Sequence, residues 1–266
     1  MRLHERRTGY MFMRVFFLVA ASFALAATLI MLPRVSAQTP DSLTDQSDGG
    51  GLRPQWYTSG PASFDGTGIY YLGRELACVM DHRGAAWMER PERERTELPA
   101  AVVRNLELGS DAIVADIGAG TGYFTFRIAT EVPQGNVLAV DIQPTMLDII
   151  ERRADIDGVT NVETVLGTET SPQLSPASVD VTLISDAYHE FSRPREMAQA
   201  IFDATKPGGR LVLIEYRGED SSVPILELHK MTEAQVRLEM EAVGFRFIEN
   251  REFLPLQHFL VFEREG

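Results

Sequence analysis

The sequence predicts a doubly wound α/β fold with a mostly parallel sheet. Three observations support this prediction. Short apolar segments recur between residues 112 and 216, helical patterns alternate with them, and a glycine-rich turn follows the first apolar segment. Apolar runs of this length are typical of strands buried on both faces of a parallel sheet. Their alternation with helices favours crossover connections and therefore parallel pairing.

The elements follow one another in a regular order. Strands are expected at residues 112–117, 136–141, 162–167, 178–185 and 211–216. A short helix at 99–108 precedes the first strand, and a KPGG turn at 206–209 precedes the fifth, because Pro-Gly suits a tight turn. A helix at 232–243 and a terminal hairpin that includes residues 256–262 complete the chain.

The charge of the chain is strongly negative and unevenly distributed. The 266 residues carry a formal net charge of −13, yet residues 1–37 hold five Arg and one Glu, which leaves 20 basic and 37 acidic residues in the remainder. Such an acidic body repels phosphate backbones, so nucleic acid is a disfavoured partner and a small-molecule substrate is expected.

Cysteine and histidine usage limits the chemistry that the sequence predicts. Cys78 is the single cysteine, which excludes an intrachain disulfide. Because it lies in the apolar segment 76–79, we interpret it as a core thiol. Five scattered histidines without HxxxH or HxH spacing predict no metal centre.

The first 37 residues have the layout of a secretory signal. Basic residues precede an uncharged, mostly apolar stretch at 15–32, and the small side chains of residues 35–37 follow it. An uncleaved membrane anchor is the alternative, because a stretch of this length just reaches across a bilayer. We therefore expect an exported or membrane-anchored protein, with a cytoplasmic location as the alternative.

Three further segments follow the N-terminal one. Residues 38–60 are expected to form a flexible linker, residues 61–108 a helical cap or lid, and residues 109–266 the ligand-binding domain. The cap has two interpretations. Either it packs on the sheet with the charged run at 92–95 as its solvated face, or it covers an active site and presents Tyr71, Arg74, His82, Trp87 and Arg90.

The glycine-rich turn distinguishes between two classes of ligand. It reads GAGTG, and a helical pattern over residues 123–129 follows it. A dinucleotide site with GxGxxG would need glycine at position 123, which is Tyr123, so an NAD-dependent oxidoreductase is disfavoured. The pattern present is DxGxGxG, from Asp116 through Gly118 and Gly120 to Gly122.

Together with Asp141 at the end of the second strand, DAYHEF at 186–191 and the KPGG turn, this loop resembles class I S-adenosylmethionine (SAM)-dependent methyltransferases. The overall pattern resembles the ubiquinone/menaquinone-biosynthesis-like branch, and WMERPERE at 87–94 with EYRGED at 215–220 resembles a bacterial subgroup of it. The resemblance covers residues 112–216 and extends into the tail. It implies a Rossmann-like sheet of about seven strands with an antiparallel last strand.

The resemblance also implies where SAM would bind. The glycine loop would hold its methionine end, Asp116 would serve its amino group, and Asp141 would accept hydrogen bonds from the ribose hydroxyls. Many relatives have an aspartate near adenine where this chain has Thr168 and Glu169, and Ile142 is either at the adenine or in the core. The cofactor-binding candidates are Asp116, Gly118, Gly120, Gly122, Asp141, Ile142, Thr168, Glu169 and Asp186.

Methyl transfer is a direct displacement, so catalysis comes largely from alignment of the reacting atoms. A base is needed only if the acceptor must lose a proton. His189 and Glu190, after the fourth strand, are the catalytic candidates, and His189 is a general base, a positioning group or a structural residue. Asp186 contacts a ligand or caps the next helix.

Substrate contacts are expected from the cap and the strand edges. Arg217 either binds an acidic group or pairs with Glu219, and His229 lines the entrance or lies on a solvated helix. The substrate-binding candidates are Tyr71, Arg74, Trp87, Tyr188, Tyr216 and Arg217. The expected function is methylation of a small, lipophilic acceptor by SAM, and the alternative is a catalytically inactive SAM-binding regulatory or envelope interaction protein.

Overall fold

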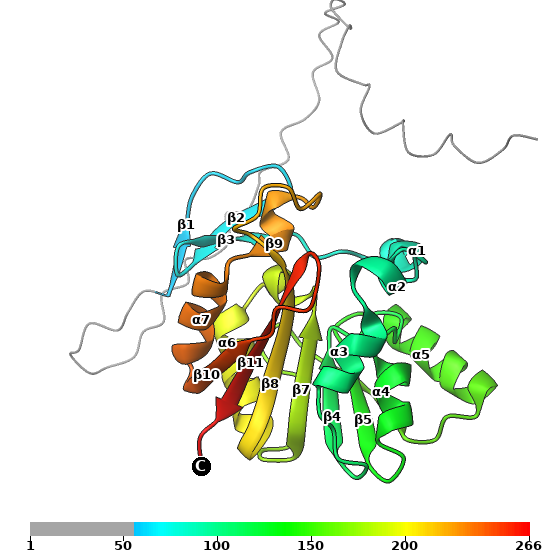
Figure 1. Cartoon of the computed structure of the whole chain (residues 1–266). Coiled ribbons are helices and arrows are strands. Elements are labelled where there is room, and N and C mark those ends of the chain that lie inside the picture. Colours follow the sequence, from blue (N-terminus) through cyan, green and yellow to red (C-terminus); the bar gives the residue numbers. More distant parts are fainter. Residues whose placement is uncertain (1–55) are drawn as a thin grey trace, which may run out of the picture. The chain divides into compact units, whose positions relative to one another are not determined.

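The computed structural model describes residues 56–266 (Figure 1). The signal or anchor expected at 1–37 and most of the linker expected at 38–60 lie outside them. Within the described residues, no helix combines the length and the apolar character needed to cross a membrane. The expected linker extends too far, because β1 (Tyr57–Ser59) already pairs antiparallel with β2 (Gly66–Tyr71).

The central sheet confirms the doubly wound prediction. Its order is β10-β11-β8-β7-β4-β5-β6, with the two-residue β9 beside β8. Strands β4 to β8 pair in parallel, and β11 is antiparallel to both β8 and β10. The strands are β4 (Ile113–Ile117), β5 (Asn136–Asp141), β6 (Val162–Leu166), β7 (Val179–Ser185), β8 (Thr205–Arg217), β9 (Lys230–Met231), β10 (Phe245–Asn250) and β11 (Gln257–Arg264).

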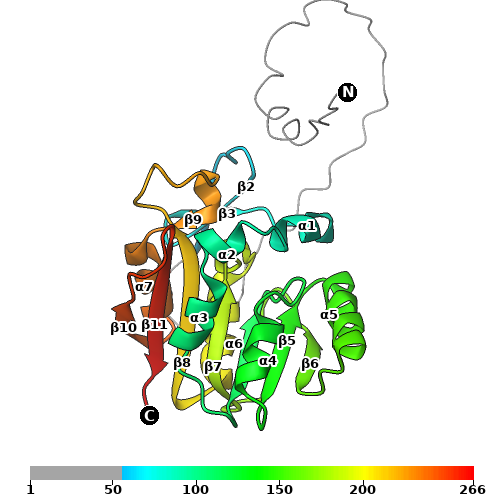
Figure 2. The same ribbon diagram turned by 45° about the vertical axis from the view of Figure 1, so that its right-hand side comes forward.

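Helices cover both faces of this sheet (Figure 2). Alternate residues of one strand point to opposite faces. In β8, Leu211 and Leu213 pack on the side of α6 and α7, whereas Val212 and Ile214 pack on the side of α3 and α4. Ile150 of α5 packs against β5. These helices are α3 (Pro99–Asn105), α4 (Thr125–Glu131), α5 (Pro144–Asp157), α6 (Pro194–Ala204) and α7 (Glu233–Glu241).

The segment before α3 is only partly helical, so the prediction of a helical cap is wrong for its first half. Strands β1, β2 and β3 (Arg74–Ala77) form a small antiparallel sheet. They are followed by η1 (His82–Gly84), α1 (Ala85–Met88) and α2 (Arg93–Thr96). In Figure 1 these cyan elements lie at the end of the main sheet toward which β7 points.

The KPGG segment lies inside β8 rather than before it. Pairing with β7 jumps from Val179–Thr205 to Val181–Arg210, so the residues between form an irregularity in the strand. Gly208 has a φ of +76°, which is the left-handed region that glycine adopts readily. The turn expected from the sequence is therefore present, but as a bulge that precedes the buried part of β8.

Candidate active site

A cavity of about 590 Å³ lies at the carboxyl ends of the parallel strands. The strand order reverses between β4 and β7, and open α/β sheets bind ligands at such a switch point. The lining comes from the ends of β4, β5, β7 and β8, from the cap, and from the loop that contains residues 224–226. One cavity therefore brings the candidate cofactor residues and the candidate acceptor residues together.

The glycine loop after β4 forms one wall of the cavity. Gly118 has a φ of +74°, and a Cβ there would lie 2.6 Å from the Cβ of Ala187. Gly120 has a φ of +56°, and both glycines line the cavity. Gly122 does not line it, and a Cβ there would lie 2.7 Å from Cε2 of Phe126. The third glycine thus serves the packing of α4.

Asp141 joins the glycine loop to the end of β5. Its Oδ2 accepts a hydrogen bond from the backbone N–H of Gly120 at 2.9 Å, and its Oδ1 accepts one from the backbone N–H of Gln143 at 2.9 Å. Burial raises the pKa of the Asp141 carboxyl, and these backbone hydrogen bonds oppose the rise. The carboxylate lines the cavity, where it can accept further hydrogen bonds from a vicinal diol.

Asp116 lies in β4 behind the glycine loop. Its Oδ2 accepts a hydrogen bond from the Thr125 hydroxyl at 2.6 Å. Burial raises the pKa of Asp116 to about 6, although this hydrogen bond opposes the rise. A cationic group in the cavity would favour the carboxylate form of Asp116, because opposite charges favour ionisation.

The adenine candidates also line the cavity. Ile142 is 44% exposed and lines the cavity, so it is not a core residue. Thr168 and Glu169 also line it. The Thr168 hydroxyl accepts a hydrogen bond from the backbone N–H of Ser171 at 3.1 Å, so it shapes its own loop.

Four ionisable side chains form a hydrogen-bonded chain at the cavity, and all of them except the buried Glu215 line it. Nδ1 of His189 lies 2.7 Å from Oε2 of Glu215, and Nε2 of His189 lies 3.0 Å from Nδ1 of His229. Nε2 of His229 in turn lies 2.6 Å from Oδ2 of Asp65. His189 is in η2 (Tyr188–Glu190) and His229 ends η3 (Glu227–His229). His229 and Asp65 reach this site from distant parts of the sequence.

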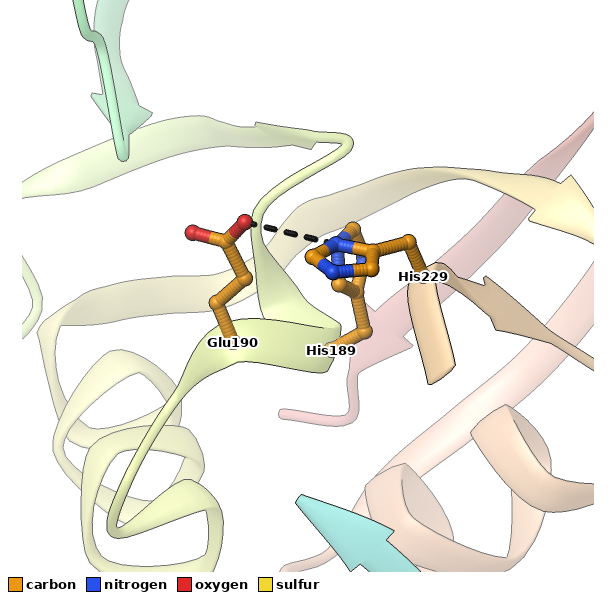
Figure 3. A group of neighbouring side chains, drawn as sticks. All are labelled: His189, Glu190 and His229. Carbon is orange, nitrogen blue, oxygen red and sulfur yellow. Dashed lines mark hydrogen bonds and ion pairs between the residues drawn. The ribbon is translucent and has the colours of Figure 1, made fainter. Parts of the chain in front are cut away.

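Glu190 converges on the same two imidazoles (Figure 3). Its Oε1 lies 3.5 Å from Nδ1 of His229 and 3.8 Å from Nε2 of His189. Its Oε2 accepts a hydrogen bond from the backbone N–H of Met80 at 3.0 Å. Hydrogen bonding to Glu190 raises the pKa of His229, and burial opposes this. These three side chains bring together donors for a metal ion, an arrangement that the histidine spacing did not reveal.

Asp186 and Tyr216 also line the cavity. Asp186 has a φ of +49° and accepts hydrogen bonds from Nε2 of Gln257 at 2.9 and 2.7 Å. The N-cap of η2 is Ala187, so Asp186 does not have the capping role that the sequence allowed. Burial raises the pKa of Asp186, and the charges of nearby carboxylates add to this.

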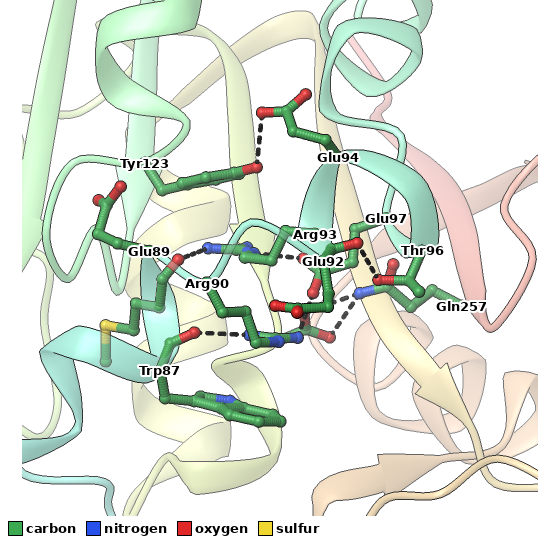
Figure 4. Close-up of polar contacts among 12 residues, drawn as sticks. Trp87, Glu89, Arg90, Glu92, Arg93, Glu94, Thr96, Glu97, Tyr123 and Gln257 are labelled. Carbon is green, nitrogen blue, oxygen red and sulfur yellow. Dashed lines mark hydrogen bonds and ion pairs between the residues drawn. The ribbon is translucent and has the colours of Figure 1, made fainter. Parts of the chain in front are cut away.

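An ion network holds α1 and α2 over the cavity (Figure 4). Glu97 is buried and pairs with the guanidinium groups of both Arg90 and Arg93. It also accepts a hydrogen bond from the Tyr216 hydroxyl at 3.2 Å. Trp87 lines the cavity and lies against Arg90, whose guanidinium carbon is 3.8 Å from its ring centroid. Arg93 is buried, so residues 92–95 are not simply a solvated face.

Two predicted substrate residues are instead structural supports for the cap. Arg74 pairs with the buried Glu239 of α7, with Nε to Oε1 at 2.8 Å. The Tyr188 hydroxyl donates to Oε2 of the same Glu239 at 2.7 Å. Neither side chain lines the cavity. Arg74 of the cap and Tyr188, which follows β7, therefore both bind Glu239 of α7, outside the cavity.

Two other predicted substrate residues are also outside the cavity lining. Tyr71 is buried and packs on Tyr57 with ring centroids 5.2 Å apart. Arg217 donates to the backbone oxygens of Leu254 and Gln257, both at 3.1 Å, rather than pairing with Glu219. Of the six substrate candidates, only Trp87 and Tyr216 line the cavity.

Cys78 lies on the cavity wall, and its interpretation as a core thiol is wrong. It follows the last residue of β3 and is exposed. The apolar side chains on either side of it suggested burial, but Val79 is itself half-exposed. Met80 and Met88 also line the cavity, although no sequence pattern pointed to them.

Comparison with known proteins agrees with this geometry. Residues 114–209 match a family described as a methyltransferase domain. An uncharacterized methyltransferase-like protein of Schizosaccharomyces pombe is 32% identical over 144 residues, which are 54% of this chain and 52% of that protein. A tRNA U34 carboxymethyltransferase of Desulfotalea psychrophila is 33% identical over 127 residues, which are 47% of this chain and 38% of that protein.

A solved structure shows the same fold. The SAM-dependent methyltransferase of Aquifex aeolicus superimposes with a TM-score of 0.65 at 22% identity, over 70% of this chain and 100% of that chain. The chain spans about half or less of the length of the curated relatives named above. The central domain therefore has the fold of SAM-dependent methyltransferases.

Proposed function

We propose that the protein transfers a methyl group from SAM to a small acceptor bound in the same cavity. The observation that carries this proposal is the continuity of the cavity. It extends from the Asp141–Gly120 corner to the group formed by His189, Glu190 and His229. A direct displacement needs donor and acceptor in contact, and one cavity shared by both supports it.

The residues of the first half suit the parts of SAM. Asp116 would stabilise the ammonium group of the methionine part, and Asp141 would accept hydrogen bonds from the ribose diol. Ile142, which is exposed in the cavity next to Asp141, offers an apolar surface to the adenine ring. Because Gly118 and Gly120 have no side chains, a ligand can approach the loop backbone closely, which supports binding of the methionine end of SAM there.

The second half suits a small and partly apolar acceptor. Trp87, Ile225 and Leu226 line the cavity together with the polar group around His189. The cavity volume of about 590 Å³ is in the range of small-molecule sites. The negative charge of the chain supports a small molecule over nucleic acid. The sequence pattern of the ubiquinone/menaquinone-like branch makes phenols and quinols the first acceptors to examine.

Export or membrane anchoring stays a proposal that depends on residues 1–37. Their basic, apolar and small-residue order supports it. An alkaline phosphatase reporter fused after Gly266 of the full chain tests it, because that enzyme is active only outside the bacterial cytoplasm. Phosphatase activity supports export, and inactivity of an intact fusion places the domain in the cytoplasm.

Methyl transfer itself is tested with SAM carrying a tritiated methyl group and a panel of phenols, quinols and amines. We expect label in at least one acceptor. We also expect transfer to fall at least tenfold in Glu190→Gln with SAM affinity unchanged. His82→Ala is the matched control, because His82 is exposed and outside the cavity lining. SAM binding without transfer to any acceptor would favour a SAM-binding protein that lacks catalysis.

A further inference from the structure

We infer that His189, Glu190 and His229 form a binding site for one divalent transition-metal ion, of which Zn²⁺ is the test case. The three donor atoms are Nε2 of His189, Nδ1 of His229 and a carboxylate oxygen of Glu190, and they lie within 4.8 Å of one another. Two imidazoles and one carboxylate are the ligand set of catalytic zinc sites and of the facial iron triad.

The hydrogen bonds around the two histidines fix which nitrogens are free. Glu215 accepts a hydrogen bond from the Nδ1–H group of His189. In the neutral ring, Nε2 of His189 therefore presents its lone pair. In the neutral form of His229, the Nε2–H group donates a hydrogen bond to Asp65, so Nδ1 of this form presents its lone pair. These two lone pairs face each other at 3.0 Å. Two neutral imidazoles whose lone pairs face each other repel, and a cation bound by both nitrogens would remove this repulsion.

The spacing of the donors suits a metal ion. At metal–nitrogen distances of about 2.1 Å, nitrogens 3.0 Å apart would subtend about 90° at the ion. Oε1 of Glu190, at 3.5 Å and 3.8 Å from the two nitrogens, is placed to supply the third ligand. The angle of about 90° between the two nitrogens is typical of neighbouring positions on a five-coordinate ion, so further positions would be open.

The surroundings of the three ligands also match a metal site. Metal-binding histidines usually donate their second N–H to a carboxylate, which fixes the ring and increases its basicity. Glu215 and Asp65 do this for His189 and His229. Glu190 is fixed by the backbone N–H of Met80. Three carboxylates around two imidazoles give a negative site that favours a divalent cation over a single shared proton.

The site opens toward the proposed acceptor. His189, Glu190, His229 and Asp65 all line the cavity. Insofar as the proposed methyl transfer holds, the open coordination positions would bind an acceptor oxygen and favour its deprotonated form. The acceptor class is then an oxygen nucleophile, such as a phenol or an enol. Metal binding itself does not depend on the methyl-transfer proposal.

Calorimetric titration with Zn²⁺ tests the site in the full chain, without an oligohistidine tag and after removal of metal by a chelator. We expect one Zn²⁺ per chain, with affinity reduced at least tenfold in Glu190→Gln and in His229→Ala. His82→Ala should bind Zn²⁺ as the original protein does. SAM binding, measured on the same samples, shows that each variant is folded.

Two results would overturn the metal site. The first is the absence of stoichiometric Zn²⁺ binding, which would mean that the two imidazoles share a proton. The second is equal Zn²⁺ affinity in the original protein, Glu190→Gln and His229→Ala. Zn²⁺ binding without SAM binding would refute only the proposed methyl transfer, with circular dichroism then used to show that the chain is folded.

Discussion

The guanidinium of Arg93 lies 2.6 Å from the carboxylate of Glu97, and both side chains are almost fully buried. Arg93 also lies over the ring of Tyr123, with its guanidinium carbon 3.7 Å from the ring centroid. The pair therefore connects the cap to the residue that follows the glycine loop. Because Arg90 shares the same carboxylate, the loss of Glu97 would leave two guanidinium groups without their partner.

The first prediction concerns this pair. Glu97→Ala should lower the free energy of unfolding by about 3–5 kcal/mol, because removing one partner leaves a buried charge uncompensated. Glu94→Gln is the control, since Glu94 is 58% exposed in its ion pair with Arg127. Its effect should stay below about 1 kcal/mol. Urea unfolding measures both values, and equal losses would refute the structural role of Glu97.

The second prediction concerns pH and Asp116. Its pKa is raised to about 6 in the folded protein, against about 3.9 in an unfolded chain. The folded state therefore binds more protons between these values, and stability falls as pH rises through this window. Asp116→Asn should abolish this pH-dependent decrease in the free energy of unfolding, which amounts to about 3 kcal/mol at pH 7. Unfolding measured from pH 4 to pH 7 tests it, and an identical pH slope in the variant would contradict it.

Bound SAM should weaken this dependence. The ammonium group of its methionine part is expected to lower the pKa of Asp116, so SAM affinity should rise as pH increases from 5 to 7. In Asp116→Asn, affinity should be lower at pH 7 and nearly constant over this range. A steep rise that persists in Asp116→Asn would assign the titration to another group.

The third prediction separates two glycines of one motif. Gly120→Ala should reduce SAM affinity at least tenfold, because its Cβ enters the cavity beside the flexible Met88 side chain. Gly122→Ala should mainly destabilise the fold, because the new Cβ would meet Phe126 and Ile150 in the core. Both variants strain the backbone at a positive φ, and beyond that strain Gly122→Ala should lower the free energy of unfolding by about 1–3 kcal/mol. Paired unfolding and SAM-binding measurements decide this, and the opposite ranking would contradict it.

The fourth prediction uses Cys78 as a reporter of the cavity. It is exposed on the cavity wall and is the single cysteine of the chain. Iodoacetamide should therefore modify the folded full chain at one site, and a ligand that fills the cavity should slow the reaction. Mass spectrometry follows the modification, with Cys78→Ser as the blank. Modification only after denaturation would show that the thiol is buried.

The cofactor half of the site was largely predictable from the sequence. The second strand was expected at residues 136–141, the bounds of β5, because its apolar run ends at a single acidic residue. The DxGxGxG loop, Asp141 and Thr168 are close in sequence to strand ends, and parallel strands bring those ends together. Local pattern and topology were therefore sufficient.

The acceptor half was less predictable, because its residues meet only through tertiary contacts. His189 and His229 come from segments that strand β8 separates, and their distance in sequence hides their contact. Arg74 and Tyr188 looked available for substrate, yet both bind Glu239, a partner on α7 that no local pattern identifies. The strands of the cap were missed because aromatic residues there do not alternate clearly.

The central claim is that SAM binds in the cavity beside the glycine loop and that Asp141 accepts hydrogen bonds from its ribose. Calorimetry of the full chain with SAM tests this most directly, together with Asp141→Ala and the exposed control Asp148→Ala. We predict that the original protein and Asp148→Ala bind one SAM with equal affinity, and that Asp141→Ala loses at least tenfold. Failure of the folded original protein to bind SAM, or undiminished binding by Asp141→Ala, would contradict the account.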